Sequence, residues 1–233
     1  MIQRLNHCNW PALESELDHF GNAPMPALLQ PEQCQALIDS YADRTRFRSR
    51  VIMQRHGFGQ GEYQYFDDPL PELIAELRAQ LYERLVPLAN RWSQRLGFEH
   101  RYPATHAEFI RHCHAAGQTQ PTPLLLRYGA GDYNCLHQDL YGPLAFPLQL
   151  TVMLSQLGED FRGGEFTLVE QRPRRQSRPD VVSLQRGDAV VFAGQYRPVT
   201  GARGDYRVTL RHGVSRVRSG ERFTLGLIFH DAQ

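Results

Sequence analysis

The sequence predicts a mainly β protein with a helical N-terminal layer. In the first half of the chain, apolar residues recur at three- and four-residue steps, which is typical of amphipathic helices. After about residue 121 the pattern changes to short apolar runs separated by Gly, Pro and Asp, which is typical of strands. With 233 residues, of which 41% are hydrophobic, the chain is long enough for one sizeable core.

Three helices are expected before residue 121. The first covers Pro31 to Asp43. The second runs from Pro71 to Leu96, where leucines at regular steps form one apolar stripe. The spacing Thr105-x-x-Glu108 is a capping-box pattern, in which the two side chains bond to backbone N–H groups at the start of a helix. It predicts a third helix from that point.

Several short strands are expected after residue 121, and their spacing favours an antiparallel sandwich or barrel. They cover residues 122–128, 148–154, 164–170, 188–193, 206–212 and 222–229. The stretch 170–180 is rich in arginine and proline, and we expect it to form a loop.

Composition excludes several function classes. The net charge is +1, so the chain as a whole does not attract nucleic acid. All 26 basic residues are arginine, which excludes a phosphate-binding loop with its lysine and Schiff-base chemistry. No run of about 18 apolar residues could span a bilayer, and the N-terminus lacks the pattern of a signal peptide. We therefore expect a cytoplasmic protein without a membrane partner.

The four cysteines have no CxxC spacing, which argues against a zinc ribbon or a disulfide framework in the cytoplasm. We expect them to be buried thiols. Cys135 lies two residues before His137, so on a regular strand the two side chains would share one face.

His137 and Asp139 are two residues apart in a segment with strand character, so both side chains are expected on one face. In the strand 206–212, alternation places His212 on the face of Val208 and Leu210, which is apolar and therefore turned inward. Two histidines and one carboxylate form the facial triad that binds Fe(II) and leaves coordination positions open. Each residue alone is a weak signal, and their combination predicts a metal site.

Arg222 follows ten residues after His212, and Thr224 occupies the next position on the same face of that strand. A guanidinium group binds a carboxylate through two hydrogen bonds, and a hydroxyl can add a third. The pair therefore predicts a binding site for a dicarboxylate co-substrate beside the metal.

The order of these motifs resembles a known enzyme family. It runs from His137-x-Asp139 through GGEF at 163–166 and GDAVVF at 187–192 to HGVSRVRSGERFTLGLIF at 212–229. This order is similar to that of the Fe(II)/2-oxoglutarate-dependent dioxygenases, in particular their prolyl-hydroxylase-like branch. Over most of its length the chain also resembles a bacterial group described as oxygenases acting on damaged DNA.

The resemblance implies a double-stranded β-helix, a form of jelly roll, and Fe(II), 2-oxoglutarate and O₂ as cofactors. His137, Asp139 and His212 would then be the catalytic residues and the metal ligands. Arg222, Thr224 and Tyr128 would bind 2-oxoglutarate. The implied reaction is hydroxylation of a C–H bond with release of succinate and CO₂.

The substrate stays open between an alkylated nucleic-acid base, which would be oxidatively demethylated, and a protein side chain, as in prolyl hydroxylation. The ten-residue step between His212 and Arg222 is that of the prolyl-hydroxylase branch. A non-catalytic sensor of metal or 2-oxoglutarate is a further alternative. The sequence does not predict the oligomeric state.

Two basic segments are candidates for substrate contact. In residues 44–66, arginines alternate with aromatic residues, which suits phosphate contacts and base stacking, and Arg55 and Tyr65 are the candidates there. In the stretch 170–180, the candidates are Arg174 and Arg175. For both segments, a solvent-exposed hairpin or loop without a binding role is the alternative.

We therefore expect one integrated domain with two parts. Residues 1–120 would form the mainly helical N-terminal support and the substrate lid. Residues 121–233 would form the double-stranded β-helix catalytic core.

Overall fold

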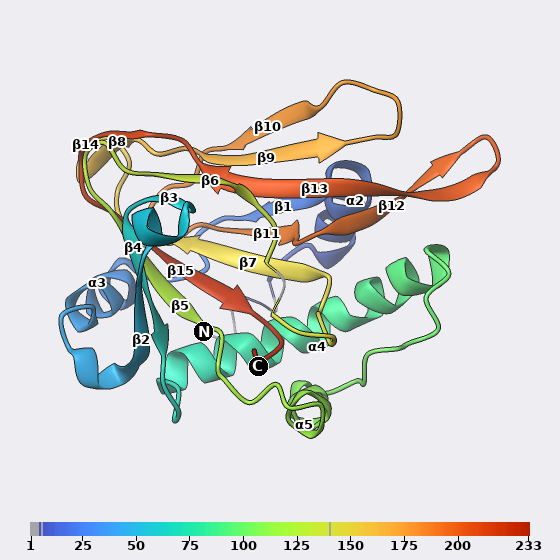
Figure 1. Ribbon diagram of the computed structural model, residues 1–233, viewed down its shortest axis with the longest axis horizontal. Helices are drawn as coiled ribbons and strands as arrows, with labels where there is room; N and C mark the ends of the chain where they lie inside the picture. The colour runs from blue at the N-terminus through green and yellow to red at the C-terminus, as the bar shows by residue number, and fades with distance from the viewer. Residues whose placement is uncertain (1–4, 6, 140) are drawn as a thin grey trace.

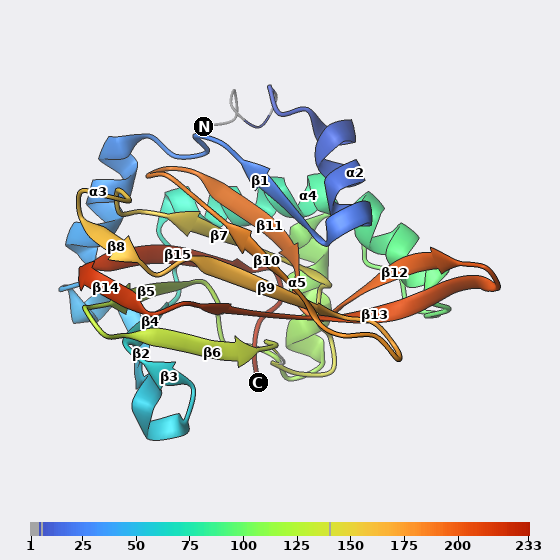
Figure 2. The ribbon, with the colours of Figure 1, turned by 90° about the horizontal axis from the view of Figure 1, so that it is seen from above.

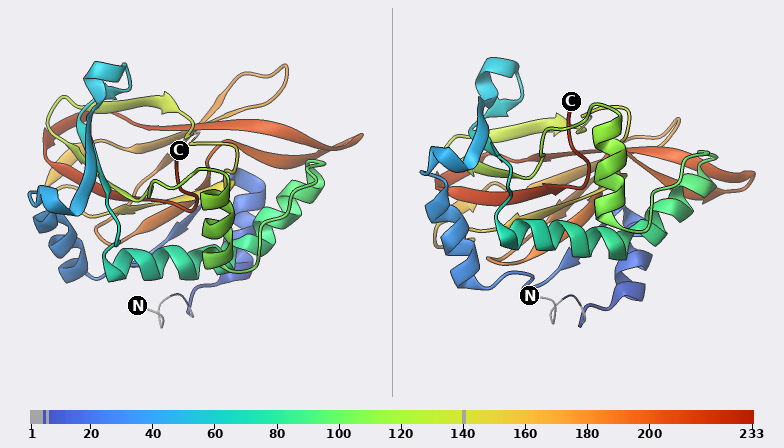
Figure 3. Two further views of the ribbon diagram at one scale, coloured as in Figure 1. Left: turned by 60° about the horizontal axis from the view of Figure 1, so that its bottom comes forward. Right: turned by 90° about the horizontal axis from the view of Figure 1, so that it is seen from below.

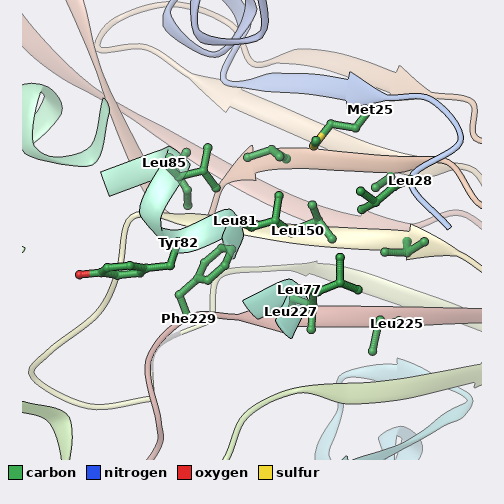
Figure 4. Packing of buried hydrophobic residues seen from close by; sticks show 14 of the residues in the cluster. Met25, Leu28, Leu77, Leu81, Tyr82, Leu85, Leu150, Leu225, Leu227 and Phe229 are labelled. Carbon is green, nitrogen blue, oxygen red and sulfur yellow. The ribbon is translucent and has the colours of Figure 1, made fainter. Parts of the chain in front are cut away.

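The apolar stripe predicted between Pro71 and Leu96 forms the longest helix, α4 (Glu72–Arg95). Its buried apolar side chains include Ile74, Leu77, Leu81, Leu85, Leu88 and Trp92. Figure 4 shows Leu77, Leu81 and Leu85 packed together with side chains of neighbouring strands, among them Leu150, Leu225 and Leu227. Burial of this stripe against a sheet is the main reason why the segment is helical in the folded chain.

The computed structural model describes residues 5, 7–139 and 141–233, and shorter helices accompany α4 in it. They are α2 (Trp10–Phe20), α3 (Pro31–Ser40) and α5 (His106–Ala115), with the 3₁₀ turns η1 (Arg44–Arg46) and η2 (Met53–His56). As the capping pattern predicts, the Thr105 hydroxyl accepts a hydrogen bond from the Glu108 N–H at the start of α5. Helix α2 was not predicted from the sequence.

A larger antiparallel sheet has the strand order β1-β11-β7-β15-β5-β4-β2. Its strands are β1 (Asn22–Met25), β2 (Phe47–Ile52), β4 (Glu62–Phe66), β5 (Leu124–Tyr128), β7 (Leu148–Met153), β11 (Ala189–Ala193) and β15 (Arg222–Ile228). Strands from the first 120 residues thus pair with strands from the rest of the chain at both ends of one sheet.

A smaller antiparallel sheet has the order β10-β9-β13-β6-β3, and β12 also pairs with β13. Its strands are β3 (Gly59–Gln60), β6 (Tyr133–His137), β9 (Phe166–Gln171), β10 (Arg178–Val182), β12 (Tyr196–Gly201) and β13 (Gly204–Val214). A separate pair consists of β8 (Phe161–Gly163) and β14 (Val217–Gly220). Figure 2 looks onto the smaller sheet and shows the β12–β13 hairpin extending beyond it.

The elements form three layers (Figure 1). The two sheets face each other, and α4 covers the other face of the larger sheet. Apolar side chains such as Met153, Phe166, Phe192 and Val214 fill part of the space between the sheets. This arrangement agrees with the predicted mainly β fold with a helical layer, and the candidate site lies between the two sheets.

The stretch 170–180 is not a loop throughout, as the sequence analysis expected. Glu170 and Gln171 end β9, and Arg178–Val182 forms β10, so only the residues between them connect the strands. Proline lacks a donor for the sheet and is tolerated on edge strands. Pro179 lies on such an edge, because β10 is the last strand of its sheet.

A buried ion pair joins α4 to the end of the chain. The Arg78 guanidinium donates to Asp231 Oδ1 at 2.7 Å and to the Ile228 carbonyl oxygen at 2.8 Å. His106 and His114 of α5 contact the same segment, at the Phe229 carbonyl oxygen and Asp231 Oδ2. Figure 3 shows α5 lying across α4 near the C-terminus.

Within the described residues, no helix is long and apolar enough to cross a membrane.

Candidate functional site

Strand pairing brings His137 and His212 face to face. In the register of β6 and β13, His212 is the direct partner of His137, whereas Val214 is the partner of Asn134. Between these two pairs, one residue of β13 therefore lies opposite two of β6, so β6 contains a β-bulge. The predicted inward face of β13 is confirmed, because Val208, Leu210 and His212 are all buried.

The bulge corrects the expectation for Cys135. On a regular strand its side chain would share the face of His137, but the extra residue in β6 breaks the alternation. Cys135 is exposed and Cys8 is half-buried, so only Cys34 and Cys113 are the buried thiols that the sequence analysis expected. All four cysteines are free.

His137, Asp139 and His212 offer ligand atoms that all lie within 4.8 Å of one another. His137 Nε2 lies 3.6 Å from Asp139 Oδ1, and His212 Nε2 lies 3.3 Å from Asp139 Oδ2. Adjacent ligand atoms with metal bonds of about 2.1 Å are separated by about 3 Å, so the spacing fits a shared ion. The set of two imidazoles and one carboxylate fits Fe(II).

The hydrogen bonds around this cluster orient its members. His137 Nδ1 lies 2.8 Å from the Cys135 carbonyl oxygen, so it carries the proton and leaves the Nε2 lone pair for a metal. Tyr141 Oη donates to Asp139 Oδ1 at 3.0 Å, and Tyr65 Oη donates to Tyr141 Oη at 3.0 Å. The side chain of Gln138, which lies between the two ligands in sequence, donates to the Gln195 and Leu210 carbonyl oxygens and so anchors the segment.

The charge states suit metal binding at neutral pH. Burial alone would raise the pKa of Asp139, but its hydrogen bond and charge interaction with His212 lower the pKa well below the usual range, so Asp139 is ionised. Burial, assisted by repulsion from His212, lowers the pKa of His137. A neutral His137 beside an ionised Asp139 is the state that coordinates a cation.

The larger sheet forms one wall of the cavity that contains these residues. Strand β15 lines it with Arg222, Thr224, Gly226 and Ile228. In the neighbouring strand β5, Tyr128 is paired with Arg222 and Leu126 with Thr224. On the other side of β15, Thr151 of β7 lies beside Gly226 and Gln149 beside Ile228. The cavity has a volume of about 290 Å³ and also contains His137, Asp139 and His212.

Arg222 is buried and forms no ion pair with a described residue. It is 1% exposed, and neither Nε nor Nη2 has a hydrogen-bond partner among the described residues. Its Nη1 lies 3.5 Å from Thr224 Oγ1, and its guanidinium lies 5.4 Å from the centre of the Tyr128 ring. Burial lowers the pKa of Arg222 to about 10, so it remains charged at neutral pH. A buried cation without a partner is costly, which points to an anionic ligand in the cavity.

Tyr128 adds an unused hydroxyl to the same end of the cavity. Its side chain is fully buried, and its Oη has no hydrogen-bond partner within the described part of the chain. Burial raises the pKa of Tyr128 above its usual range, so the hydroxyl stays neutral and can donate. Arg222, Thr224 and Tyr128 together can bind one carboxylate.

The GGEF motif makes room for this group. Gly164 has φ +64°, and a Cβ atom there would lie 2.9 Å from Arg222 Cδ. Only glycine adopts this φ readily, and only glycine leaves space for the arginine.

The predicted substrate residues are not all near the cavity. Tyr65 lines it. Arg55 is exposed on η2 and does not line it, although Phe58 of the same segment does. Arg174 and Arg175 are exposed in the turn between β9 and β10 and do not line the cavity either. Contact of these arginines with a substrate stays a prediction.

Sequence reasoning missed Tyr141 and Gln149, which both line the cavity. Tyr141 lies two residues after Asp139, so its spacing alone could have suggested that it shares the face of Asp139. Nothing in the sequence marks Gln149, because its place beside Ile228 follows from the pairing of β7 with β15.

Solved structures with a similar fold include a hydroxylase and an oxygenase. A prolyl-4-hydroxylase from Pseudomonas putida superimposes with a TM-score of 0.57 at 14% identity, covering 96% of this chain and 99% of the other. An oxidoreductase of the 2OG-Fe(II) oxygenase family from Burkholderia pseudomallei gives 0.54 at 18% identity, covering 97% and 94%. The predicted jelly-roll fold is confirmed.

Sequence comparison identifies the family. The protein Rv2227 of Mycobacterium tuberculosis is 50% identical over 167 residues, which are 72% of each chain. Residues 61–232 match the family Oxygenase-NA, described as "Oxygenase, catalysing oxidative methylation of damaged DNA". This range includes the three candidate metal ligands and the three residues that can bind a carboxylate. The predicted oxygenase class is confirmed, and the chain belongs to the Oxygenase-NA family.

Proposed function

We propose that this oxygenase uses His137, Asp139 and His212 to hold Fe(II), and Arg222, Tyr128 and Thr224 to bind the distal carboxylate of 2-oxoglutarate. When bound, iron, 2-oxoglutarate and O₂ supply the oxidant that hydroxylates a C–H bond, with release of succinate and CO₂. The observation that carries the proposal is the buried guanidinium of Arg222, whose Nε and Nη2 have no hydrogen-bond partner among the described residues and which lines the same cavity as His137 and His212.

The protein's part is to bind, orient and exclude water. Tyr141 fixes the orientation of Asp139 through its hydrogen bond. Arg222 offers Nε and Nη2 to a carboxylate as two parallel donors, which fixes the position of the bound acid as well as its charge. Leu126, Phe166 and Phe192 line the cavity and keep it apolar, which strengthens the interaction between charges inside it.

Anaerobic addition of Fe(II) and 2-oxoglutarate should produce a visible charge-transfer band, and His212→Ala should abolish it.

Arg222→Leu should weaken 2-oxoglutarate binding by roughly 30-fold or more, because a buried charged hydrogen bond contributes about 2 kcal/mol or more. It should have little effect on the stability of the free protein, since Nε and Nη2 of Arg222 have no hydrogen-bond partner among the described residues to lose. The exposed Arg218→Leu is the matched control. Wild-type affinity in the Arg222 variant would contradict the assignment.

We further propose that the substrate is an alkylated nucleic-acid base. The family description and the aromatic residues of the cavity, among them Phe58, Tyr63 and Tyr65, support this choice. Hydroxylation of an N-methyl group gives a hydroxymethyl group, which leaves as formaldehyde. Oligonucleotides with one methylated base should therefore stimulate succinate formation and release formaldehyde in equal amounts.

A protein side chain is the second candidate substrate. The similarity of the fold to that of the P. putida prolyl-4-hydroxylase and the ten-residue step from His212 to Arg222 support it. Proline-containing peptides tested in the same assay separate the two candidates, because their hydroxylation releases no formaldehyde. A protein that binds Fe(II) and 2-oxoglutarate but forms no succinate with any substrate would instead be a sensor.

A further inference from the structure

A second cavity shares Asp139 with the first. Its volume is about 280 Å³. It lies between the end of α4, the segment after it and the segment that follows β11, and its lining includes Trp92, Phe98, His100, Tyr102 and Tyr196. Asp139 and Gln149 line both cavities. The second cavity therefore ends at the carboxylate of the candidate metal centre.

Gln149 lies where the two cavities meet, and its side-chain amide has no hydrogen-bond partner among the described residues. The residue is 3% exposed, yet its side chain makes no hydrogen bond to any described residue. The fully buried Gln118 is different, since it donates to the Leu144 and Asp231 carbonyl oxygens and accepts from the Leu144 N–H. Unlike Nε and Nη2 of Arg222, the amide atoms of Gln149 keep some accessible surface, so they can form hydrogen bonds with a ligand in the cavity.

Gly194 provides the space for this amide. A Cβ atom at Gly194 would lie 2.9 Å from Gln149 Nε2 and 3.2 Å from its Cδ. The backbone of Gly194 is not in the left-handed region, so its conformation alone does not require glycine. The absence of a side chain at this position therefore serves the placement of Gln149.

We propose that the second cavity is the substrate-base site, and that Gln149 recognises the hydrogen-bonding edge of a base bound there. This inference rests on the proposed function. A side-chain amide offers one donor and one acceptor side by side, which matches the paired donor and acceptor on the edge of a nucleobase. A prolyl ring has no such edge. The amide's position between both cavities would hold the base with its alkyl group toward the metal centre.

The walls of the cavity suit a flat ring. Phe98 and His100 stack at 5.5 Å with an interplanar angle of 18°, and Tyr102 contacts His100 edge-on at 5.2 Å. The Arg207 guanidinium lies over the ring of Tyr196, 4.4 Å from the ring centre. Aromatic faces bind unstacked bases, and an adjacent guanidinium can contact the phosphate of the same strand.

The first test compares the two buried glutamines. Gln149→Leu should leave the melting temperature unchanged or raise it, because it removes an unpaired polar group. Gln118→Leu should lower it by roughly 5 °C or more, because it leaves backbone groups of Leu144 and Asp231 without partners. Gln149→Leu should also weaken anaerobic binding of a single-stranded oligonucleotide with one methylated adenine by roughly tenfold or more.

Gly194→Ala tests the same amide without changing it. The added methyl group should displace Gln149 Nε2 and weaken oligonucleotide binding to a similar extent. Because both changes act on one interaction, the double variant Gln149→Leu/Gly194→Ala should bind as weakly as either single variant. Additive losses would contradict the shared mechanism.

Three outcomes overturn the inference. The first is binding of the oligonucleotide by Gln149→Leu with wild-type affinity. The second is a fall in the melting temperature of Gln149→Leu as large as that of Gln118→Leu. The third is binding of a proline-containing peptide, and not of the oligonucleotide, by the wild type. In each case the charge-transfer band and succinate formation of the wild type report separately on the oxygenase function. The band's absence would refute the proposed oxygenase function itself. Its presence together with either of the first two outcomes refutes only the base site, and its presence together with the third refutes the base as substrate as well.

Discussion

At the scale of single residues, Tyr141 decides how Asp139 is presented to a metal. Its hydroxyl is the hydrogen-bond donor to Asp139 Oδ1, at 3.0 Å. Loss of a hydrogen bond to a metal ligand commonly lowers metal affinity 10- to 100-fold. We expect Tyr141→Phe to weaken Mn(II) binding to the metal-free protein by roughly this factor, as measured by calorimetric titration.

Tyr65→Phe serves as the control for that experiment. It removes only the hydrogen bond from Tyr65 to Tyr141 and leaves the one from Tyr141 to Asp139 in place. Its effect on metal affinity should be smaller than that of Tyr141→Phe. Equal Mn(II) affinity in Tyr141→Phe and the wild type would show that the hydroxyl does not position the carboxylate.

Gly164 controls the other end of the cavity. Alanine at this position combines an unfavourable φ of +64° with a contact of 2.9 Å to Arg222 Cδ. Gly164→Ala should therefore destabilise the protein by roughly 1–3 kcal/mol and weaken 2-oxoglutarate binding. Urea unfolding and the charge-transfer titration measure the two effects.

Gly158→Ala is the matched control for the backbone part of this effect. Gly158 also has a positive φ, +89°, but a Cβ atom there would meet nothing within 4 Å. It should lower stability without changing 2-oxoglutarate affinity. If both variants bind 2-oxoglutarate equally well, Gly164 is needed for its backbone alone.

At the scale of elements, the packing of α5 against the end of the chain makes stability depend on pH. Burial lowers the pKa of His106 to about 4, and its Nε2 bonds to the Phe229 carbonyl oxygen. The unfolded chain, with an ordinary histidine pKa of about 6.5, binds more protons between these values. Stability is therefore complete above about pH 6.5 and falls as the pH decreases toward 4.

The variant His106→Gln keeps a hydrogen-bond donor for the Phe229 carbonyl oxygen and removes the imidazole that titrates. Between pH 7 and pH 5 the wild type should lose roughly 2 kcal/mol more stability than this variant. Burial also lowers the pKa of His230 to about 4, so part of the pH dependence should remain in His106→Gln. Urea unfolding at both pH values measures the difference, and parallel losses in the two proteins would refute the role of His106.

Elements also differ in how well the sequence predicts them. Helix α4 was predictable because its leucines form an uninterrupted stripe that only a helix buries on one side. Strand β10 was not, because its Arg and Pro residues suit an edge strand as well as a loop. The bulge in β6 was not either, because alternation assumes two residues per repeat and cannot locate an extra one. His137, Asp139 and His212 were identified despite the bulge, since they lie beyond it or on the regular part of β13.

At the scale of the whole molecule, the first 120 residues complete the sheet of the remaining chain. β1 pairs with β11 and β4 pairs with β5, and α4 covers Leu150, Leu225 and Leu227. A fragment of residues 121–233 would expose both sheet edges and this apolar face. We expect it not to fold alone, as seen by loss of cooperative unfolding in circular dichroism. A cooperative transition in the fragment would contradict this.

The whole molecule also sets the limit of sequence reasoning about the site. The metal cluster and Arg222 could be predicted because spacing within two short segments is enough to place them on faces. Gln149 and the second cavity could not, because they depend on which strands of the larger sheet are neighbours and on how the segment after α4 returns to the sheet. Local periodicity contains neither kind of information.

The pairing of His137 with His212 has a consequence for motion. Beyond β6 the smaller sheet has only β3, which is two residues long, so the outer side of β6 has little support from backbone hydrogen bonds. Local unfolding of β6 would separate the imidazoles of His137 and His212. A metal ion bound by both imidazoles would be lost on unfolding, so its binding free energy would make local unfolding less favourable. Amide hydrogen exchange along β6 would therefore slow when metal binds, while exchange in α4 would follow only global unfolding.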